Sequence, residues 1–219
     1  RCTLSALCPT QLTVTMNPTT TVPMLDDIRA AAARIAPHAH VTPVLRSGSL
    51  DRIAGCRLHF KCENFQRIGA FKFRGACNAV MALDAGTAAR GVVTHSSGNH
   101  GAALALAARE RGIPCHVVVP EGAVASKLAA IEAYGAVLHR CAPTIAAREA
   151  AAAAVQADTG ATLVHPYTDP RVIAGQATAA LELLAEAGPL DVLMAPLGGG
   201  GLLAGSAITG RARGGEGLL

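Results

Sequence analysis

The chain has 219 residues, enough for one ordinary domain or two small ones, and 51% of them are hydrophobic, which provides apolar surface for a sizeable core. Its formal net charge of +4 is spread over scattered arginines without a basic run, which argues against nucleic-acid binding. No uninterrupted apolar run reaches membrane-spanning length, which argues against a transmembrane helix.

Short apolar strands alternate with helices along most of the chain. Such alternation indicates right-handed βαβ units and parallel or mixed sheets with helices on both faces, so the fold class is α/β. We expect helices at 25–37, 73–83, 102–112, 124–135, about 144–158 and about 170–187, and strands at 56–63, 91–95, 114–120, 136–141, 161–166 and 191–196.

The two ends depart from this rhythm. Residues 1–23 show no helical or alternating periodicity and lack the order of a signal peptide, so we interpret them as a disordered or spurious leader, with Met16 or Met24 as the start. The tail, RARGGEGLL, follows just after a helix has begun, and we expect the chain to be a fragment. The seven cysteines have neither zinc spacing nor a C-x-x-C pair, which is typical of reduced thiols in a cytoplasmic protein.

Two strand-to-helix turns have the composition of binding loops. The first, LGGGG at 197–201, has four successive glycines before a helix, and a glycine-rich helix start is a cradle for phosphate. Gly199, Gly201 and Ala204 also satisfy the dinucleotide pattern G-x-G-x-x-G/A, so a nicotinamide or flavin oxidoreductase is an alternative. The alternative loses weight because that motif normally opens its domain, with an acidic residue about twenty positions further on.

The second turn, SSGNHG at 96–101, combines two hydroxyls, an amide and an imidazole. Backbone N–H groups in such a turn can bind a carboxylate, and Ser97 can exchange a proton. Helix capping is the alternative, but it explains one Ser or Asn and not six small or polar residues in succession.

A third stretch, IGAFKFRGA, places Lys72 between Phe71 and Phe73 in a chain with three lysines and four phenylalanines. A partly desolvated ammonium loses its proton more easily and becomes a nucleophile, although a lysine whose stem lies on apolar surface would look the same. A reactive amine, a phosphate cradle and a carboxylate-binding loop together are what a pyridoxal phosphate enzyme acting on amino acids requires.

The stretches GAFKFRGACNAV, THSSGNHGAALALAA, HPYTDPRVIAGQAT and APLGGGGLLAG resemble the fold-type II (tryptophan synthase β-like) pyridoxal phosphate enzymes, and most of all the serine racemases and threonine/serine dehydratases (ammonia-lyases). The similarity runs from about residue 25 to residue 208. It implies a small α/β domain at 91–168 inserted into a large cofactor-binding domain at 24–90 and 169–219. It also implies that the large domain is incomplete.

The resemblance implies roles for individual residues. Lys72 matches the lysine that binds pyridoxal phosphate covalently, Phe71 the residue beside its ring, and Asn99 the partner of its 3-hydroxyl. Ser97 matches the acid/base serine on the face opposite the lysine. The phosphate loop corresponds to Gly198, Gly199, Gly200, Gly201 and Leu202, and the site for the substrate carboxylate to Ser96, Ser97, Asn99, His100 and Arg148.

The implied activity is threonine/serine dehydration, which converts L-threonine or L-serine to a 2-oxo acid and ammonia. Tyr167 stands where certain racemases have asparagine, which favours the dehydratase, with serine racemase as the alternative. A cysteine or threonine synthase and a truncated, non-catalytic chain are further alternatives. The family also implies a homodimer. Its divalent-cation ligands belong to a carboxyl-terminal region that is absent here, so we expect no metal ligands in this chain.

Overall fold

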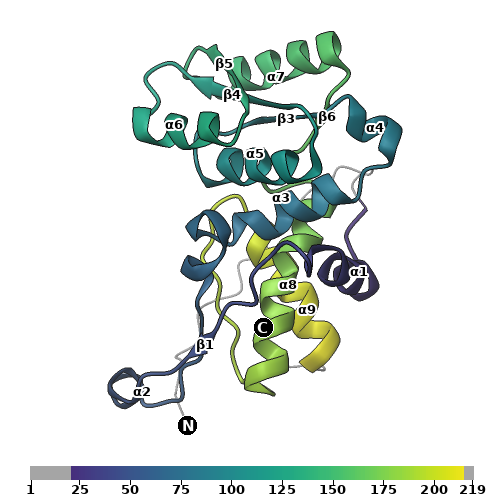
Figure 1. Ribbon diagram of the computed structural model, residues 1–219. Helices are drawn as coiled ribbons and strands as arrows, with labels where there is room; N and C mark the ends of the chain where they lie inside the picture. Colours follow the sequence, from purple (N-terminus) through teal and green to yellow (C-terminus); the bar gives the residue numbers. More distant parts are fainter. Residues whose placement is uncertain (1–20, 215–219) are drawn as a thin grey trace.

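The computed structural model describes residues 21–214, so most of the predicted leader lies outside the described residues. A sheet flanked by helices stands above a layer made mostly of helices (Figure 1). The fold class is therefore α/β, as the alternation of strands and helices predicted.

Four parallel strands form the main sheet in the order β5-β4-β3-β6. Val117 and Val119 point to the face covered by α5 and α6, whereas Val118, between them, packs against α7 on the other face. The strands are β3 (Val92–His95), β4 (Cys115–Pro120), β5 (Val137–Cys141) and β6 (Thr162–Leu163), and the helices are α5 (Asn99–Arg111), α6 (Ala125–Ala133) and α7 (Ile145–Thr159).

Helix α5 is buried on two sides, because the sheet covers one and α3 (Lys72–Met81) covers the other (Figure 1). Its apolar residues are small and are distributed around the whole helix, which is the pattern of a helix enclosed in a core. Its buried apolar side chains are Ala103, Leu104, Ala105, Leu106, Ala107 and Ala108.

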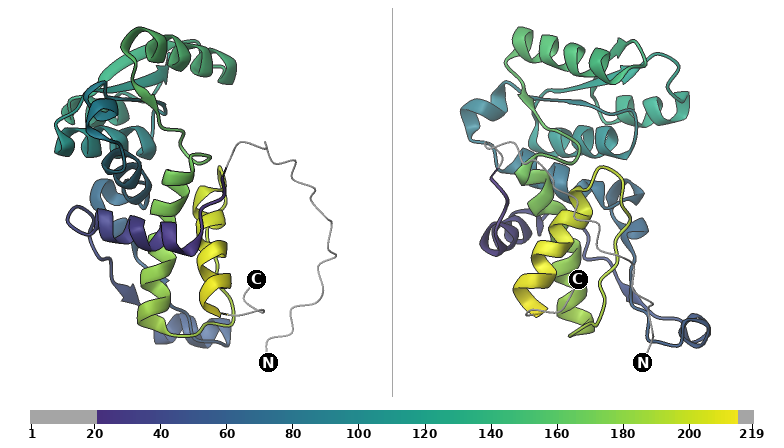
Figure 2. Two further views of the ribbon diagram at one scale, coloured as in Figure 1. Left: turned by 90° about the vertical axis from the view of Figure 1, so that its right-hand side faces the viewer. Right: turned by 180° about the vertical axis from the view of Figure 1, so that it is seen from behind.

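The lower layer contains α1 (Leu25–Ile35), α3, α8 (Pro170–Ala187) and α9 (Gly201–Gly214), with α8 packed against the other three (Figure 2). Helices α3 and α8 approach so closely at Gly75 and Gly175 that a Cβ atom on Gly175 would lie 2.6 Å from the Cα of Gly75. Only glycine permits this separation, so the crossing point is fixed by sequence.

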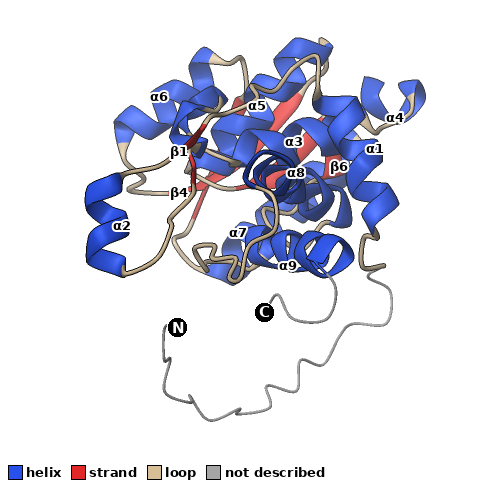
Figure 3. Ribbon diagram, turned by 90° about the horizontal axis from the view of Figure 1, so that it is seen from below, coloured by secondary structure: helices blue, strands red, loops and turns tan. Residues whose placement is uncertain are grey.

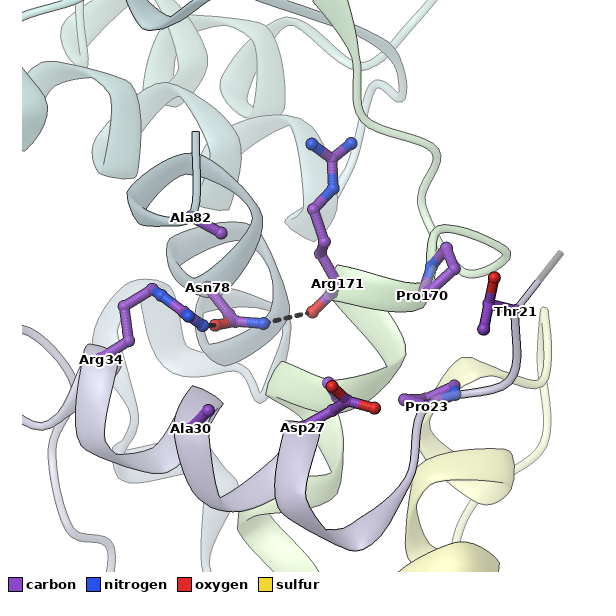
Figure 4. Close-up of a pocket in the computed structure, with 10 residues that line it drawn as sticks. Thr21, Pro23, Asp27, Ala30, Arg34, Asn78, Ala82, Pro170 and Arg171 are labelled. Carbon is purple, nitrogen blue, oxygen red and sulfur yellow. Dashed lines mark hydrogen bonds between the residues drawn. The ribbon is translucent and has the colours of Figure 1, made fainter. Parts of the chain in front are cut away.

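Asn78 of α3 links α1 to α8 (Figure 4). Its side-chain oxygen accepts a hydrogen bond of 2.5 Å from Arg34, and its amide nitrogen donates one of 2.7 Å to the backbone oxygen of Arg171. These residues line a pocket of about 260 Å³ between the three helices. The buried amide therefore has partners on both of the neighbouring helices.

Residues 44–61 extend away from the helices on one side (Figure 3). Strand β1 (Val44–Leu45) pairs antiparallel with β2 (Phe60–Lys61), and helix α2 (Gly48–Ala54) connects them. Two 3₁₀ turns, Glu63–Phe65 and Arg67–Gly69, lead to α3, and α4 (Ala85–Ala89) leads from α3 to the main sheet. The strand predicted at 56–63 is thus shortened to two residues, because β1 is its one neighbour among the described residues.

The strand predicted at 191–196 is wrong. This segment is extended but forms no strand, since no other strand of residues 21–214 lies beside it to satisfy its backbone groups. Several of its apolar side chains, and that of the leucine after it, are consequently exposed, by 60% for Val192, 84% for Met194 and 72% for Leu197.

Candidate active site

Lys72 is the first residue of α3, and a strained turn precedes it. Ile68 and Gly69 both have left-handed backbone angles, with φ of 59° and 71°. A β-branched residue rarely adopts positive φ, so the packing around Ile68 must hold it there. The turn ends just before the lysine and so sets the direction in which α3 starts.

The amine of Lys72 lies in a half-buried environment. Its Nζ donates a hydrogen bond of 2.9 Å to the backbone oxygen of Pro166 and lies 5.4 Å from the centre of the Phe71 ring. Desolvation by burial lowers the pKa of Lys72 below its ordinary value of 10.5. Phe73, by contrast, is fully buried in the core with Arg67 over its ring, so of the two flanking rings it is Phe71 that lies beside the amine.

The SSGNHG loop joins β3 to α5 and leaves polar groups available. The N-cap of α5 is Gly98, without a capping side-chain hydrogen bond, so the capping interpretation of these residues does not hold. Ser96 Oγ accepts a long bond of 3.4 Å from the Gly98 amide. Within residues 21–214 the side chains of Ser97 and Asn99 make no hydrogen bond, so both are available to a ligand.

His100 is buried and uncharged. Its Nε2 donates a hydrogen bond of 3.2 Å to the Val164 carbonyl, so its Nδ1 is an acceptor, and this atom is buried without a partner in the described part of the chain. Burial, followed by the nearby charge of Lys72, lowers the pKa of His100 to about 3. The ring therefore offers a carboxylate no positive charge, and its geometry fits the support of the loop better than direct binding.

The loop after β6 contains a second imidazole at the same edge of the sheet. His165 Nδ1 accepts hydrogen bonds from the amides of Tyr167 and Thr168, at 3.4 and 3.2 Å, which places the ring proton on Nε2. Its ring meets those of His95 and Tyr167 edge to face, with centres 5.1 and 4.6 Å apart. Burial lowers the pKa of His165, which favours the neutral ring.

The glycine loop precedes α9 and packs against Tyr167. A Cβ atom on Gly199 would lie 2.2 Å from the Tyr167 ring, and Gly200 has a φ of 89°. The bond from the Ala204 amide to the Gly200 oxygen, 2.8 Å long, starts the helical ladder, so the preceding amides at 201–203 have no acceptor within the helix. A glycine backbone with free amides at the start of a 14-residue helix fits a phosphate group.

One loop, residues 164–168, brings these parts together. It accepts the hydrogen bonds of Lys72 and His100, and its Tyr167 lies against the glycine loop. Leu202, at the start of α9, joins Phe71 in the lining of a cavity of about 300 Å³. Lys72, the serine loop and the glycine loop thus all contact the loop at 164–168.

Arg148 has no hydrogen bond to Lys72 or to the loops described above. It lies in the first turns of α7, half-buried, and within residues 21–214 its Nε is buried without a hydrogen-bond partner. Neither Lys72 nor the serine loop bonds to it. Sequence reasoning also missed His95 and His165, although both stand at the carboxyl ends of strands, where ligands bind in α/β sheets.

A buried ionic cluster supports the start of α3. The fully buried Arg74 binds Glu63 and Glu182, with 2.7 Å from Nε to Glu63 Oε2 and 2.7 Å from Nη1 to Glu182 Oε1. Glu182 also binds Lys61 Nζ at 2.6 Å, and the Lys61 side chain is only 7% exposed. Despite the opposing effect of burial, its hydrogen bonds to the two carboxylates raise the pKa of Arg74. The cluster anchors α3 two residues after Lys72 and occupies the amine of Lys61.

Comparison with known proteins identifies the family to which the chain belongs. Residues 35–217 match the family model described as pyridoxal-phosphate dependent enzyme. The chain belongs to this family. It is 51% identical over 188 residues to a β-hydroxyaspartate dehydratase of Paracoccus denitrificans, covering 86% of this chain and 60% of that protein.

Two solved structures have folds similar to that of this chain. A maize serine racemase has a TM-score of 0.86 and 48% identity, over 88% of this chain and 58% of the other. A threonine deaminase of T.th. has a TM-score of 0.80 and 46% identity, over 87% of this chain and 61% of the other. The chain thus spans about 60% of the length of the relatives it matches. None of the helices in the described part of the chain has the length and hydrophobicity to span a bilayer.

Proposed function

We propose that the site is that of an ammonia-lyase (dehydratase) that uses pyridoxal phosphate and acts on β-hydroxy amino acids such as L-threonine and L-serine. The observation that carries the proposal is the half-buried amine of Lys72, with its lowered pKa, bound to the loop at 164–168 that also contacts the serine loop and the glycine loop. Relatives that act on hydroxy amino acids support the reaction class.

The residues present fit the cofactor. The free amides at 201–203 and the glycines before them would hold the phosphate, Phe71 would lie beside the ring, and Asn99 would bond its hydroxyl. When bound in this site, pyridoxal phosphate would supply an electron sink for the charge that develops at the substrate α-carbon. We assign the substrate carboxylate to the serine loop, whose Ser97 and Asn99 side chains are free in the described structure.

The chain's own residues then move the protons. The amine of Lys72, neutral once its proton is lost, accepts the α-proton as general base, a role that its lowered pKa favours. The protonated amine then returns this proton to the β-hydroxyl, which leaves as water, and the enamine that remains is hydrolysed to the 2-oxo acid and ammonia. Phe71 and the loop at 164–168 restrict water around the amine.

Racemisation is a second candidate on the same site. The hydroxyl of Ser97 makes no hydrogen bond within residues 21–214 and is therefore available to return a proton to the α-carbon. If it does so from the face opposite Lys72, the product is the inverted amino acid. The likeness to the maize serine racemase favours this alternative.

The cofactor site is tested by adding pyridoxal phosphate to the purified chain, recording the visible spectrum, and mapping the lysine labelled after borohydride reduction. We expect an absorption band and label on Lys72. Lys72→Ala should abolish both, whereas Lys61→Arg, which changes the amine of the ionic cluster, should leave the label in place. Label confined to Lys61 or Lys127 would refute the assignment.

The reaction is tested by measuring 2-oxo acid and ammonia from L-serine, L-threonine and L-threo-3-hydroxyaspartate. The last substrate is included because a dehydratase of β-hydroxyaspartate is 51% identical. Chiral analysis of the remaining amino acid detects racemisation. Inverted serine without 2-oxo acid would favour the racemase, and label on Lys72 without either product would leave a cofactor-binding chain that lacks catalysis.

We further propose that the whole protein is a cytoplasmic homodimer. The cysteines at 56, 62, 77, 115 and 141 are free thiols, which fits a reducing compartment. The exposed apolar side chains at 192, 194 and 197 fit a surface that another polypeptide covers. Sedimentation velocity of the full-length protein tests the dimer, and a monomer at micromolar concentration would contradict it.

A further inference from the structure

Two histidines on neighbouring strands of the main sheet are in direct contact. His116 of β4 and His139 of β5 place Nδ1 and Nε2 3.1 Å apart, with ring centres 5.2 Å apart and ring planes at 45°. Both rings are partly exposed to solvent. The residues two positions further along each strand, Val118 and Cys141, pack in the cluster that α7 covers, so the two rings share that face of the sheet.

The pair is remote from the candidate active site. His116 is the second residue of β4, near the amino end of the strand, whereas the serine loop follows the carboxyl end of β3. The two strands run parallel, so the amino end of β4 and the carboxyl end of β3 lie at opposite ends of the strands. The reaction proposed above uses neither ring, and within residues 21–214 no carboxylate forms an ion pair with either.

The separation of the two nitrogens suits a metal ion. Imidazole nitrogens bind Zn²⁺ at about 2.0–2.1 Å, and two such ligands at angles between square and tetrahedral are about 2.8–3.4 Å apart. The observed 3.1 Å, a hydrogen bond in this structure, lies inside this range. One of the two nitrogens carries the shared proton, and once that proton moves to the other nitrogen of its ring, a small rotation of the rings directs both lone pairs at one ion.

We propose that His116 and His139 form a two-histidine site for a borderline divalent transition-metal ion such as Zn²⁺. Water would complete its coordination, since no group of three or more His, Cys, Asp and Glu side chains in the described structure is arranged to hold a metal. The bound ion would join β5, at the edge of the sheet, to β4. The inference is independent of the proposed enzymatic function.

The site is tested by titrating the ¹⁵N-labelled chain with Zn²⁺ and following the ring nitrogens of each histidine by long-range ¹H–¹⁵N NMR. We expect the Nδ1 of His116 and the Nε2 of His139 to shift together with a single apparent affinity. Amide hydrogen exchange in β5 should slow at the same concentrations. Because each ring is observed separately, binding of Zn²⁺ to thiols elsewhere does not produce this signal.

Variants test whether the two rings act together. His116→Gln and His139→Gln should each weaken binding at the remaining ring on the order of a hundredfold, because a two-point attachment is lost. His59→Gln, which changes a histidine outside the sheet, should leave the affinity unchanged. If the two ring nitrogens do not respond to Zn²⁺ in the unsubstituted chain, or respond with unrelated affinities, there is no shared site.

Discussion

The amine of Lys72 and the carbonyl of Pro166, which are 94 positions apart in sequence, are joined by a hydrogen bond of 2.9 Å. The bond connects the first residue of α3 to the loop that leaves the last strand of the main sheet. Because Tyr167 of the same loop lies against Gly199, the position of the amine is coupled to that of the glycine loop. The loop at 164–168 therefore contacts every segment of the candidate site.

The first prediction concerns the reactivity of Lys72. Because desolvation lowers its pKa, a larger fraction of this amine is neutral at any pH below 10.5 than in an unfolded chain. We expect reductive methylation of Lys72 in the folded chain to reach half its maximal rate at a lower pH than in the same chain in urea. Peptide mass spectrometry separates the three lysines, and identical pH profiles in the two states would contradict the prediction.

The second prediction concerns stability at acid pH. His100 has a pKa of about 3 in the folded chain and an ordinary value of 6.5, so between these values the unfolded state binds the extra proton. Stability is therefore present above pH 6.5 and is lost as the pH falls towards 3, at up to about 1.4 kcal/mol per pH unit. Urea denaturation between pH 7 and pH 4 should show this slope. His100→Gln should reduce it, and an unchanged slope would show that other groups cause it.

The third prediction concerns the glycine loop. Gly199→Ala would place a Cβ atom against the Tyr167 ring, which we expect to cost about 1–3 kcal/mol of stability and to weaken binding of pyridoxal phosphate. Gly48→Ala, in α2, is the control, because a Cβ there meets only the end of the Arg52 side chain, at 3.8 Å. Adding Tyr167→Ala should restore part of the loss. Equal effects of the two glycine substitutions on the spectrum with cofactor would show that the contact with Tyr167 is unimportant.

The fourth prediction concerns the buried ionic cluster. Arg74→Met would leave Glu63 and Glu182 without their shared partner, which we expect to lower the free energy of unfolding by about 3–5 kcal/mol. Arg29→Met breaks an exposed ion pair with Asp26 and should change stability little. Urea denaturation monitored by circular dichroism gives both values. A similar small effect for both substitutions would mean that the cluster relaxes or admits water.

Sequence reasoning succeeded where local signals and global packing agree. Helix α8 was predicted with its observed limits because Asp169 caps its start, Pro170 occupies its first turn and Gly188 follows its end. The short helices α2 and α4 were missed, although Ser47 and Asp84 accept capping hydrogen bonds at their starts. Their lengths of seven and five residues are too short for a helical period to be visible.

The errors have a common cause. A local sequence pattern indicates which backbone conformation a segment prefers, but it does not indicate which distant segment will pack or pair with it. The apolar run at 191–196 prefers an extended backbone, but strand formation depends on a neighbour that residues 21–214 do not provide. Likewise, the roles suggested for Lys72 and the two turns came from local chemistry. The contact between His95 and His165 joins segments 70 positions apart and could not be read from either one.

The enclosure of α5 has a mechanical consequence. This helix separates the sheet, which supplies the serine loop, from the helices that supply Lys72 and the glycine loop. Its buried apolar side chains are mostly alanine, and small side chains make shallow ridges, so this contact opposes a small sliding displacement of α5 along α3 less than deeply interdigitated side chains would. A ligand whose carboxylate binds the serine loop on one side of α5 and whose phosphate binds the glycine loop on the other side would connect the two parts. Its binding would then hold the sheet and the helices in one relative position.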